Sequence, residues 1–263
     1  MAKPSSYYDQ AYYDTDPTKG YPGPYNLACA PWGRIARALI FTFGILGVTS
    51  VTDFGCARGF VLWHLKNAGW ATKGYDFSEY AVQTAMEGLD IEVADVAAKR
   101  REFQAADLAL CMDVLEHIDE KRLPQALTNM RAATGKVFVA QAYLPEVDYG
   151  PINDMPEHVT VKPREWWTAQ FDKAGFRPHV LEGEYKLNVR RMCLRPFGEM
   201  WAGSSFVLEK KEEEPILTAK LALESETESE RTIESAEDRN PVAVEPGWQV
   251  AHAWKPTEAE IFQ

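Results

Sequence analysis

The 263-residue sequence lacks the features of a disulfide framework, a zinc cluster or a membrane-spanning protein. Its four cysteines include no C-x-x-C pair, so we expect neither a structural metal site nor disulfide bonds. The longest apolar run, residues 38–52, is about 15 residues long, whereas a membrane-spanning helix needs about 20. No secretory leader is recognisable, and with unpaired cysteines this leads us to expect a cytoplasmic protein without a membrane partner.

The sequence also has no block of basic residues. Its net charge of −11 lies mainly in one segment. Residues 212–263 hold 13 acidic and 4 basic residues, so 26 acidic and 24 basic residues precede them and nearly cancel. A nearly neutral body has no basic face for nucleic acid, and we do not expect a nucleic-acid partner. We predict three parts: a lid segment rich in Tyr, Pro and Gly (1–33), a globular domain (34–211), and an acidic, disordered tail (212–263). The tail ends in a segment with two tryptophans, which is a candidate docking site for a protein partner.

Short apolar runs alternate with helical patterns from residue 50 onward, and this alternation predicts an α/β fold. Ser78 is the expected N-cap of one helix, and Pro163 and Gly175 bracket another. Such a chain forms a doubly wound, mainly parallel sheet with right-handed crossovers. The predicted strands are 50–54, 71–77, 90–95, 106–115 and 135–143, with two late strands near 177–188 and 204–211.

The turn "VTDFGCARGF" follows the first predicted strand and leads into a helix. Gly55 and Gly59 let the backbone approach a ligand, and the helix N-terminus offers free N–H groups. Acidic residues recur at or near successive strand ends, which meet at one edge of a parallel sheet. They are Asp53, Asp76, Asp95 and Asp113. Turn and cap roles explain any one of these acids, but a nucleoside site explains the set, since a carboxylate accepts both ribose hydroxyls.

Four segments in this order resemble the class I S-adenosylmethionine-dependent methyltransferases: "VTDFGCARGF", "KGYDFSEYAV", "VADV" and "ADLALCMDVLEHI". The resemblance covers residues 51–176 and implies a Rossmann-like, seven-stranded sheet, mostly parallel, with an antiparallel last strand. Ala57 stands where the family often has glycine, and an alanine is tolerated there if its φ is negative. A dinucleotide-binding dehydrogenase would instead need G-x-G-x-x-G, which this turn does not have.

The resemblance also implies which residues contact S-adenosyl-L-methionine. In chain order, the methionine end would be lined by Asp53, Gly55, Ala57 and Gly59, the ribose and adenine by Asp76, Phe77, Asp95 and Val96, and the sulfonium region by Asp113, Val114 and His117. Cys56 is expected to pack beside the loop and not to act as a nucleophile.

The sequence contains fewer signals for the acceptor molecule than for the cofactor. The Asn/Asp-Pro-Pro-aromatic segment of amine-directed nucleic-acid methylases and the Pro-Cys nucleophile of cytosine-carbon enzymes are both missing, which disfavours a nucleic-acid base. The long connection 143–167 follows the fifth strand. Its His158 is the general base for a hydroxyl acceptor, a hydrogen-bond partner of the substrate, or a loop histidine that anchors the lid. Trp166 and Trp167 favour core positions over a substrate platform.

The sequence therefore predicts a methyltransferase for a small-molecule or glycan acceptor, with transfer to oxygen. Two alternatives stay open: a protein or nucleic-acid methyltransferase recruited through the tail, and a non-catalytic scaffold that binds a partner through the tail. The N-terminal tyrosines either cover the pocket or pack on the body surface. They are Tyr7, Tyr8, Tyr12 and Tyr13.

Overall fold

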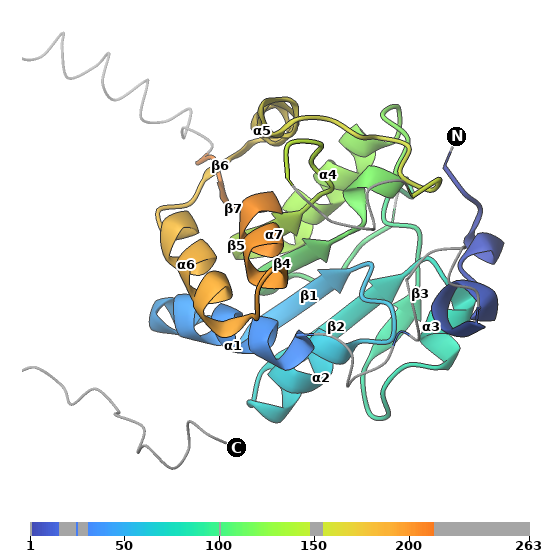
Figure 1. Ribbon diagram of the computed structural model, residues 1–263, viewed down its shortest axis with the longest axis horizontal. Helices are drawn as coiled ribbons and strands as arrows, with labels where there is room; N and C mark the ends of the chain where they lie inside the picture. Colours follow the sequence, from blue (N-terminus) through green and yellow to red (C-terminus); the bar gives the residue numbers. More distant parts are fainter. Residues whose placement is uncertain (1, 16–24, 26–30, 100, 148–154, 213–263) are drawn as a thin grey trace, which may run out of the picture. The chain divides into compact units, whose positions relative to one another are not determined.

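The computed structural model describes residues 2–15, 25, 31–99, 101–147 and 155–212 (Figure 1). The contacts within the chain separate Met1–Glu212 from Glu213–Gln263, and every described residue belongs to the first of these units. All of the predicted acidic tail after Glu212, including its tryptophans, lies outside the described residues.

Seven strands form one sheet in the order β3-β2-β1-β4-β5-β7-β6. β7 runs antiparallel to β5 and to β6, and the other neighbouring strands are parallel. The predicted doubly wound sheet with an antiparallel last strand is confirmed. The strands are β1 (Ser50–Phe54), β2 (Ala71–Asp76), β3 (Ile91–Val93), β4 (Ala106–Met112), β5 (Thr134–Gln141), β6 (Phe176–Pro178) and β7 (Ser205–Lys210).

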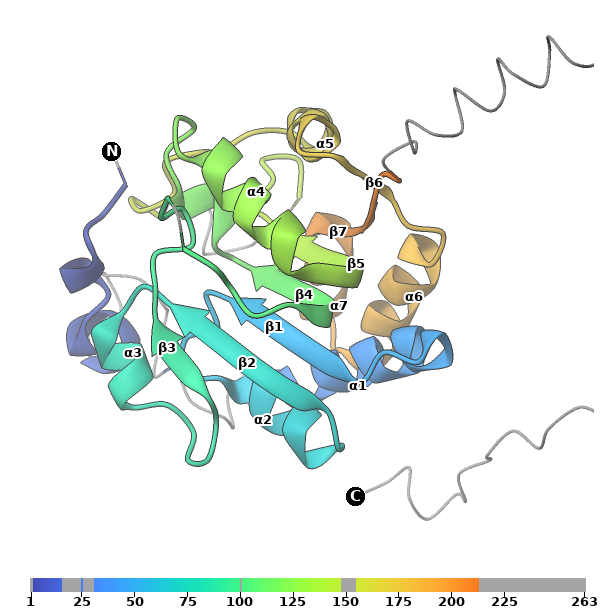
Figure 2. The same ribbon diagram turned by 180° about the vertical axis from the view of Figure 1, so that it is seen from behind.

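Helices cover both faces of the sheet, because the central strands are apolar on both sides. In β4, Leu108 and Leu110 join one core cluster, while Ala109 and Cys111 join the other. The first cluster also holds buried side chains of α1, α2, α6 and α7, and the second those of α4 and α5. Figure 1 shows α1, α2, α6 and α7 in front of the sheet, and Figure 2 shows α4 over the opposite face. The helices are α1 (Trp32–Phe43), α2 (Phe60–Asn67), α3 (Glu79–Gln83), α4 (Leu123–Ala133), α5 (Arg164–Lys173), α6 (Glu182–Met192) and α7 (Phe197–Ser204).

Among the described residues, no helix combines the length and the hydropathy needed to cross a bilayer. The expected N-cap of α3 is present, since Ser78 Oγ accepts a hydrogen bond of 3.0 Å from the backbone N–H of Ala81.

One predicted strand is much shorter than expected. Within residues 177–188 only the first two positions are extended, and α6 occupies 182–192. The reason is the spacing of the buried residues: Tyr185 and Val189 are four positions apart, so they share one face of a helix and pack on the core. Helix α7 is an element that the sequence did not predict.

Candidate active site

A cavity of about 620 Å³ lies at the carboxyl ends of β1, β2 and β4. This volume falls within the roughly 300–1,000 Å³ typical of small-molecule sites. The structure brings the sequence-predicted residues together, because eleven of the twelve line this one cavity and only Gly59 does not. The eleven are Asp53, Gly55, Ala57, Asp76, Phe77, Asp95, Val96, Asp113, Val114, His117 and His158.

The loop after β1 is shaped by left-handed backbone conformations. Gly55 has a φ of 80°, and a Cβ there would lie 2.1 Å from Cγ2 of Val114, so only glycine fits. Ala57 has a φ of 49°, so the condition of a negative φ is not met. Its N–H donates a hydrogen bond of 2.7 Å to Oδ2 of Asp76, and this bond offsets the strain of a left-handed alanine.

Gly59 and Cys56 have packing roles in this loop. Gly59 precedes α2 with a φ of 76°, and a Cβ on it would lie 2.5 Å from Leu89. Cys56 is buried against Gly74, and burial raises the pKa of its thiol well above the usual value. A thiol with a raised pKa is a poor nucleophile, which agrees with the expected packing role.

Asp76 is held in place by two backbone N–H groups. Its Oδ1 accepts from Ser78 at 2.8 Å and its Oδ2 accepts from Ala57 at 2.7 Å. Burial raises the pKa of Asp76 to about 6, and the backbone hydrogen bonds oppose that rise. Each carboxylate oxygen can accept two hydrogen bonds, so the ionised group still has an acceptor position on each oxygen for a pair of hydroxyls.

The cavity lining carries more acids than bases. Burial raises the pKa of Asp53 to about 8, with repulsion from Asp76 as the second cause. Burial also raises the pKa of Asp113. The backbone of Asp113 is left-handed, with a φ of 53°. Buried acids are stabilised by a nearby positive charge, so the cavity favours a cationic ligand. The acids in the lining are Asp53, Asp76, Asp95, Asp113 and Glu116, and the bases are Lys3 and Arg122.

Both carboxylate oxygens of Asp95 already have partners within the chain, which the sequence did not indicate. Its Oδ1 accepts from the N–H of Ala97 at 2.9 Å, and its Oδ2 forms an ion pair with Arg122. Arg122 also lines the cavity and was missed by the sequence reasoning. Val96 and Phe77 also line the cavity, and Phe77 is 37% exposed.

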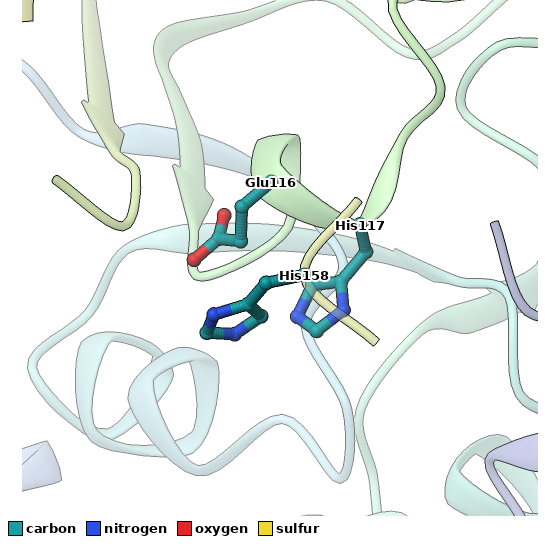
Figure 3. A group of neighbouring side chains, drawn as sticks. All are labelled: Glu116, His117 and His158. Atoms are coloured by element: carbon teal, nitrogen blue, oxygen red, sulfur yellow. The ribbon is translucent and has the colours of Figure 1, made fainter. Parts of the chain in front are cut away.

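A second polar group lies where β4 ends. Glu116 and His117 belong to the short 3-10 helix Leu115–His117, and His158 comes from the connection between β5 and α5. Figure 3 shows the side chains of Glu116, His117 and His158 close together. The N–H groups of Val159 and Thr160 both donate to the carbonyl of Glu116 at 2.9 Å, which fixes the two segments against each other.

These three side chains are strongly desolvated. Glu116 is 1% exposed; its Oε1 accepts from the N–H of Tyr143 at 3.1 Å, and its Oε2 has no partner among the described residues. Burial raises the pKa of Glu116 well above its usual value, and Asp113 raises it further. Burial lowers the pKa of His117 to about 3, with His158 as the next cause, and lowers that of His158 to about 4. Both imidazoles are therefore neutral at pH 7.

Glu116 was missed by the sequence reasoning. A signal was present, because Glu116 stands directly before His117 in the quoted segment "ADLALCMDVLEHI", just after the end of β4. One carboxylate and two neutral imidazoles make a set that can bind a metal ion, and their ligand atoms all lie within 4.8 Å of one another.

The N-terminal segment reaches the cavity. Tyr8, Tyr12 and Tyr13 line it, and the hydroxyl of Tyr8 is 3.4 Å from Nδ1 of His117. An ion pair of 2.7 Å between Asp14 and Arg58 holds this segment to the loop after β1. Of the two alternatives left open for the tyrosines, the structure favours the cavity for these three.

The tryptophan pair after residue 165 is part of the body, as expected. Trp167 is fully buried in the core, and Trp166 packs beside it. A different aromatic wall, missed in the sequence, completes the cavity. It consists of Trp32, Phe60, Phe197 and Trp201, from α1, α2 and α7, and Met200 of α7 also lines the cavity.

Comparison with known proteins identifies the family. Residues 33–180 match the family described as a methyltransferase domain. The ubiquinone biosynthesis O-methyltransferase of Cupriavidus pinatubonensis is 30% identical over 108 residues, which cover 37% of this chain and 43% of the relative. The match thus spans less than half of that relative's length.

Two solved structures share the fold. A SAM-dependent methyltransferase from Archaeoglobus fulgidus has 19% identity and a TM-score of 0.50, covering 70% of this chain and 95% of its own. A SAM-bound amino pentose methyltransferase from Micromonospora echinaspora has 13% identity and a TM-score of 0.53, covering 70% and 93%. Since the family match covers more than half of the chain, the chain belongs to the class I S-adenosylmethionine-dependent methyltransferase family.

Proposed function

We propose that this chain transfers a methyl group from S-adenosylmethionine to an oxygen atom of a small-molecule or glycan acceptor. The observation that carries the proposal is that the acids at the ends of β1, β2 and β4 share one cavity with Glu116, His117 and His158. A cofactor site and an acceptor site must adjoin in this way, because methyl transfer is an in-line displacement between two bound molecules.

The cofactor side follows from charge and hydrogen bonding. Asp76 takes the two ribose hydroxyls on its free acceptor positions. Gly55 and Ala57 leave room for the methionine portion, and Val96 and Phe77 lie beside the adenine. The acids Asp53, Asp76, Asp95 and Asp113 favour the positively charged sulfonium over a neutral nucleoside.

The cavity lining contains few cationic groups. Acids outnumber bases in the lining, and this disfavours phosphorylated acceptors and the nucleic-acid backbone. Among the described lining residues Arg122 is paired with Asp95, so Lys3 is the one cation left for a phosphate. The aromatic wall offers flat apolar surfaces, which suit an aromatic ring or the apolar face of a sugar.

His158 is the proposed residue at the acceptor oxygen. Its Nδ1 has no hydrogen-bond partner among the described residues, and the residue lines the cavity. As the acceptor oxygen bonds to the methyl carbon, the carbon–sulfur bond breaks, its electron pair stays on sulfur, and the hydroxyl proton must leave. His158 assists that deprotonation. The name of the curated relative, an O-methyltransferase, supports oxygen as the acceptor atom.

Methyl-labelled S-adenosylmethionine tests this proposal against pools of metabolites, glycans, proteins and nucleic acids, with Asp76→Ala as the cofactor-site control. We expect a labelled product in the metabolite or glycan pool with the wild type and little with the control. Label in protein or nucleic acid would favour the tail-recruited alternative. Binding of S-adenosylhomocysteine without turnover on any pool would favour the scaffold.

A further inference from the structure

Three potential metal ligands meet beside the proposed acceptor site. The carboxylate of Glu116 and the imidazoles of His117 and His158 have ligand atoms that all lie within 4.8 Å of one another (Figure 3). We propose that these three residues bind a divalent transition-metal ion and that this ion holds and activates the acceptor oxygen. The second half of this inference rests on the proposed function, and the first half does not.

The ligand types select the class of ion. Imidazole nitrogen suits Zn²⁺, Fe²⁺ and related ions, whereas Mg²⁺ and Ca²⁺ prefer sites built from oxygen alone. Two histidines and one carboxylate leave at least one coordination position open, as in catalytic zinc and iron sites. All three residues line the cavity, so an open position has access to a molecule bound there.

Unpartnered polar atoms provide the second observation. Oε2 of Glu116 and Nδ1 of His158 are buried and have no hydrogen-bond partner among the described residues. Buried polar atoms without a partner are uncommon and costly, and a bound ion is one of the few groups that satisfies both kinds of atom at once. A cation also offsets the acidic lining described above.

The surroundings hold the three residues as metal ligands are usually held. Oε1 of Glu116 accepts from the N–H of Tyr143, which leaves Oε2 as the free oxygen. Nδ1 of His117 lies 3.4 Å from the hydroxyl of Tyr8, a contact of the kind that orients a ligand imidazole. The two hydrogen bonds from Val159 and Thr160 to the carbonyl of Glu116 keep the segment of His158 in register with that of Glu116.

The ion would change how the acceptor is activated. A hydroxyl bound to a divalent cation loses its proton to solvent more readily, and the resulting oxygen anion attacks the methyl carbon as the carbon–sulfur bond breaks. In this arrangement the cation activates the hydroxyl, and His158 acts by holding the cation and not as the general base.

Co²⁺ is the probe, because its visible absorption reports coordination by protein ligands. The full chain is stripped with a chelator, titrated with Co²⁺, and compared with Glu116→Gln, His158→Asn and the matched control His64→Gln. His64 lies on α2 and does not line the cavity. Glu116→Gln keeps an oxygen for the N–H of Tyr143, and its thermal midpoint, measured alongside, reports whether it folds.

We expect one Co²⁺ per chain for the wild type and His64→Gln, and an affinity at least about 100-fold lower for folded Glu116→Gln and His158→Asn. Saturable binding that is unchanged in both variants, or no saturable binding to the wild type, would overturn the proposal. Calorimetry with S-adenosylhomocysteine on the metal-free chain separates the two ideas. Cofactor binding without Co²⁺ binding rejects the metal site alone, and Co²⁺ binding without cofactor binding rejects the proposed function.

Discussion

Replacing Asp76 by alanine tests the cofactor site at its best-defined residue. In the ligand-free chain this carboxylate accepts the N–H groups of Ser78 and Ala57, and it is 7% exposed. Alanine removes the acceptor for two ribose hydroxyls and leaves two backbone N–H groups without their partner. Asp76→Asn is the milder change, because the amide keeps one acceptor oxygen but loses the charge.

The expected loss follows from the number of hydrogen bonds. Each hydrogen bond to a charged group contributes about 1.5–3 kcal/mol, so two of them contribute about 3–6 kcal/mol. The affinity for S-adenosylhomocysteine should therefore fall by about 10²–10⁴-fold in Asp76→Ala. A smaller loss, about 10–100-fold, is expected for Asp76→Asn.

Titration calorimetry with S-adenosylhomocysteine measures these losses. Asp107→Asn is the matched control, because Asp107 accepts hydrogen bonds from Thr49 and Ser50 near the start of β4, far along the strand from the cavity. It should bind like the wild type. The affinity of the wild type should also fall below pH 6, since the pKa of Asp76 is about 6 and the protonated acid is a weaker acceptor. A folded Asp76→Ala that binds within threefold of the wild type would refute the assignment.

Four further predictions concern other parts of the chain. His158→Ala should keep cofactor affinity and lose turnover by roughly 10²–10⁴-fold, and full activity on an identified acceptor would remove it from the reaction. Gly55→Ala, whose Cβ would lie 2.1 Å from Val114, should lower the free energy of unfolding by about 2–5 kcal/mol in urea titrations; an unchanged midpoint would contradict the loop geometry. Burial raises the pKa of Asp53 to about 8, so between about pH 4 and pH 8 the folded chain keeps a proton that the unfolded chain has lost. The fold therefore loses stability as pH rises through this range. Asp53→Asn should therefore raise the thermal midpoint more at pH 8.5 than at pH 5, and equal shifts would count against this. A chain ended after Glu212 should keep its thermal midpoint and its cofactor affinity, and a drop of many degrees would show that the tail stabilises the body.

The sheet and the cofactor side were predictable because their signals are local. Short apolar runs that end in an acid, followed by a glycine turn or a helix cap, place Asp53, Asp76 and Asp113 at or near strand ends without knowledge of distant contacts. The antiparallel direction of β7 came from the resemblance to the family and not from the strand pattern itself.

The remainder depends on contacts between distant residues. The positive φ of Ala57 is supported by Asp76, 19 positions away, so no local pattern indicates it. Helix α6 was predicted as a strand because its apolar residues are sparse, and Tyr185 and Val189 reveal their helical spacing only once the core that buries them is known. The aromatic wall joins α1 to α7, which are separated by most of the chain.

A crystal structure of the full chain with S-adenosylhomocysteine bound tests the central claim most directly. We expect the ribose hydroxyls on the carboxylate of Asp76, and the sulfur near Asp113 with His158 on the side where the methyl group would project. A cofactor bound outside this cavity, or bound with its ribose away from Asp76, would contradict the account.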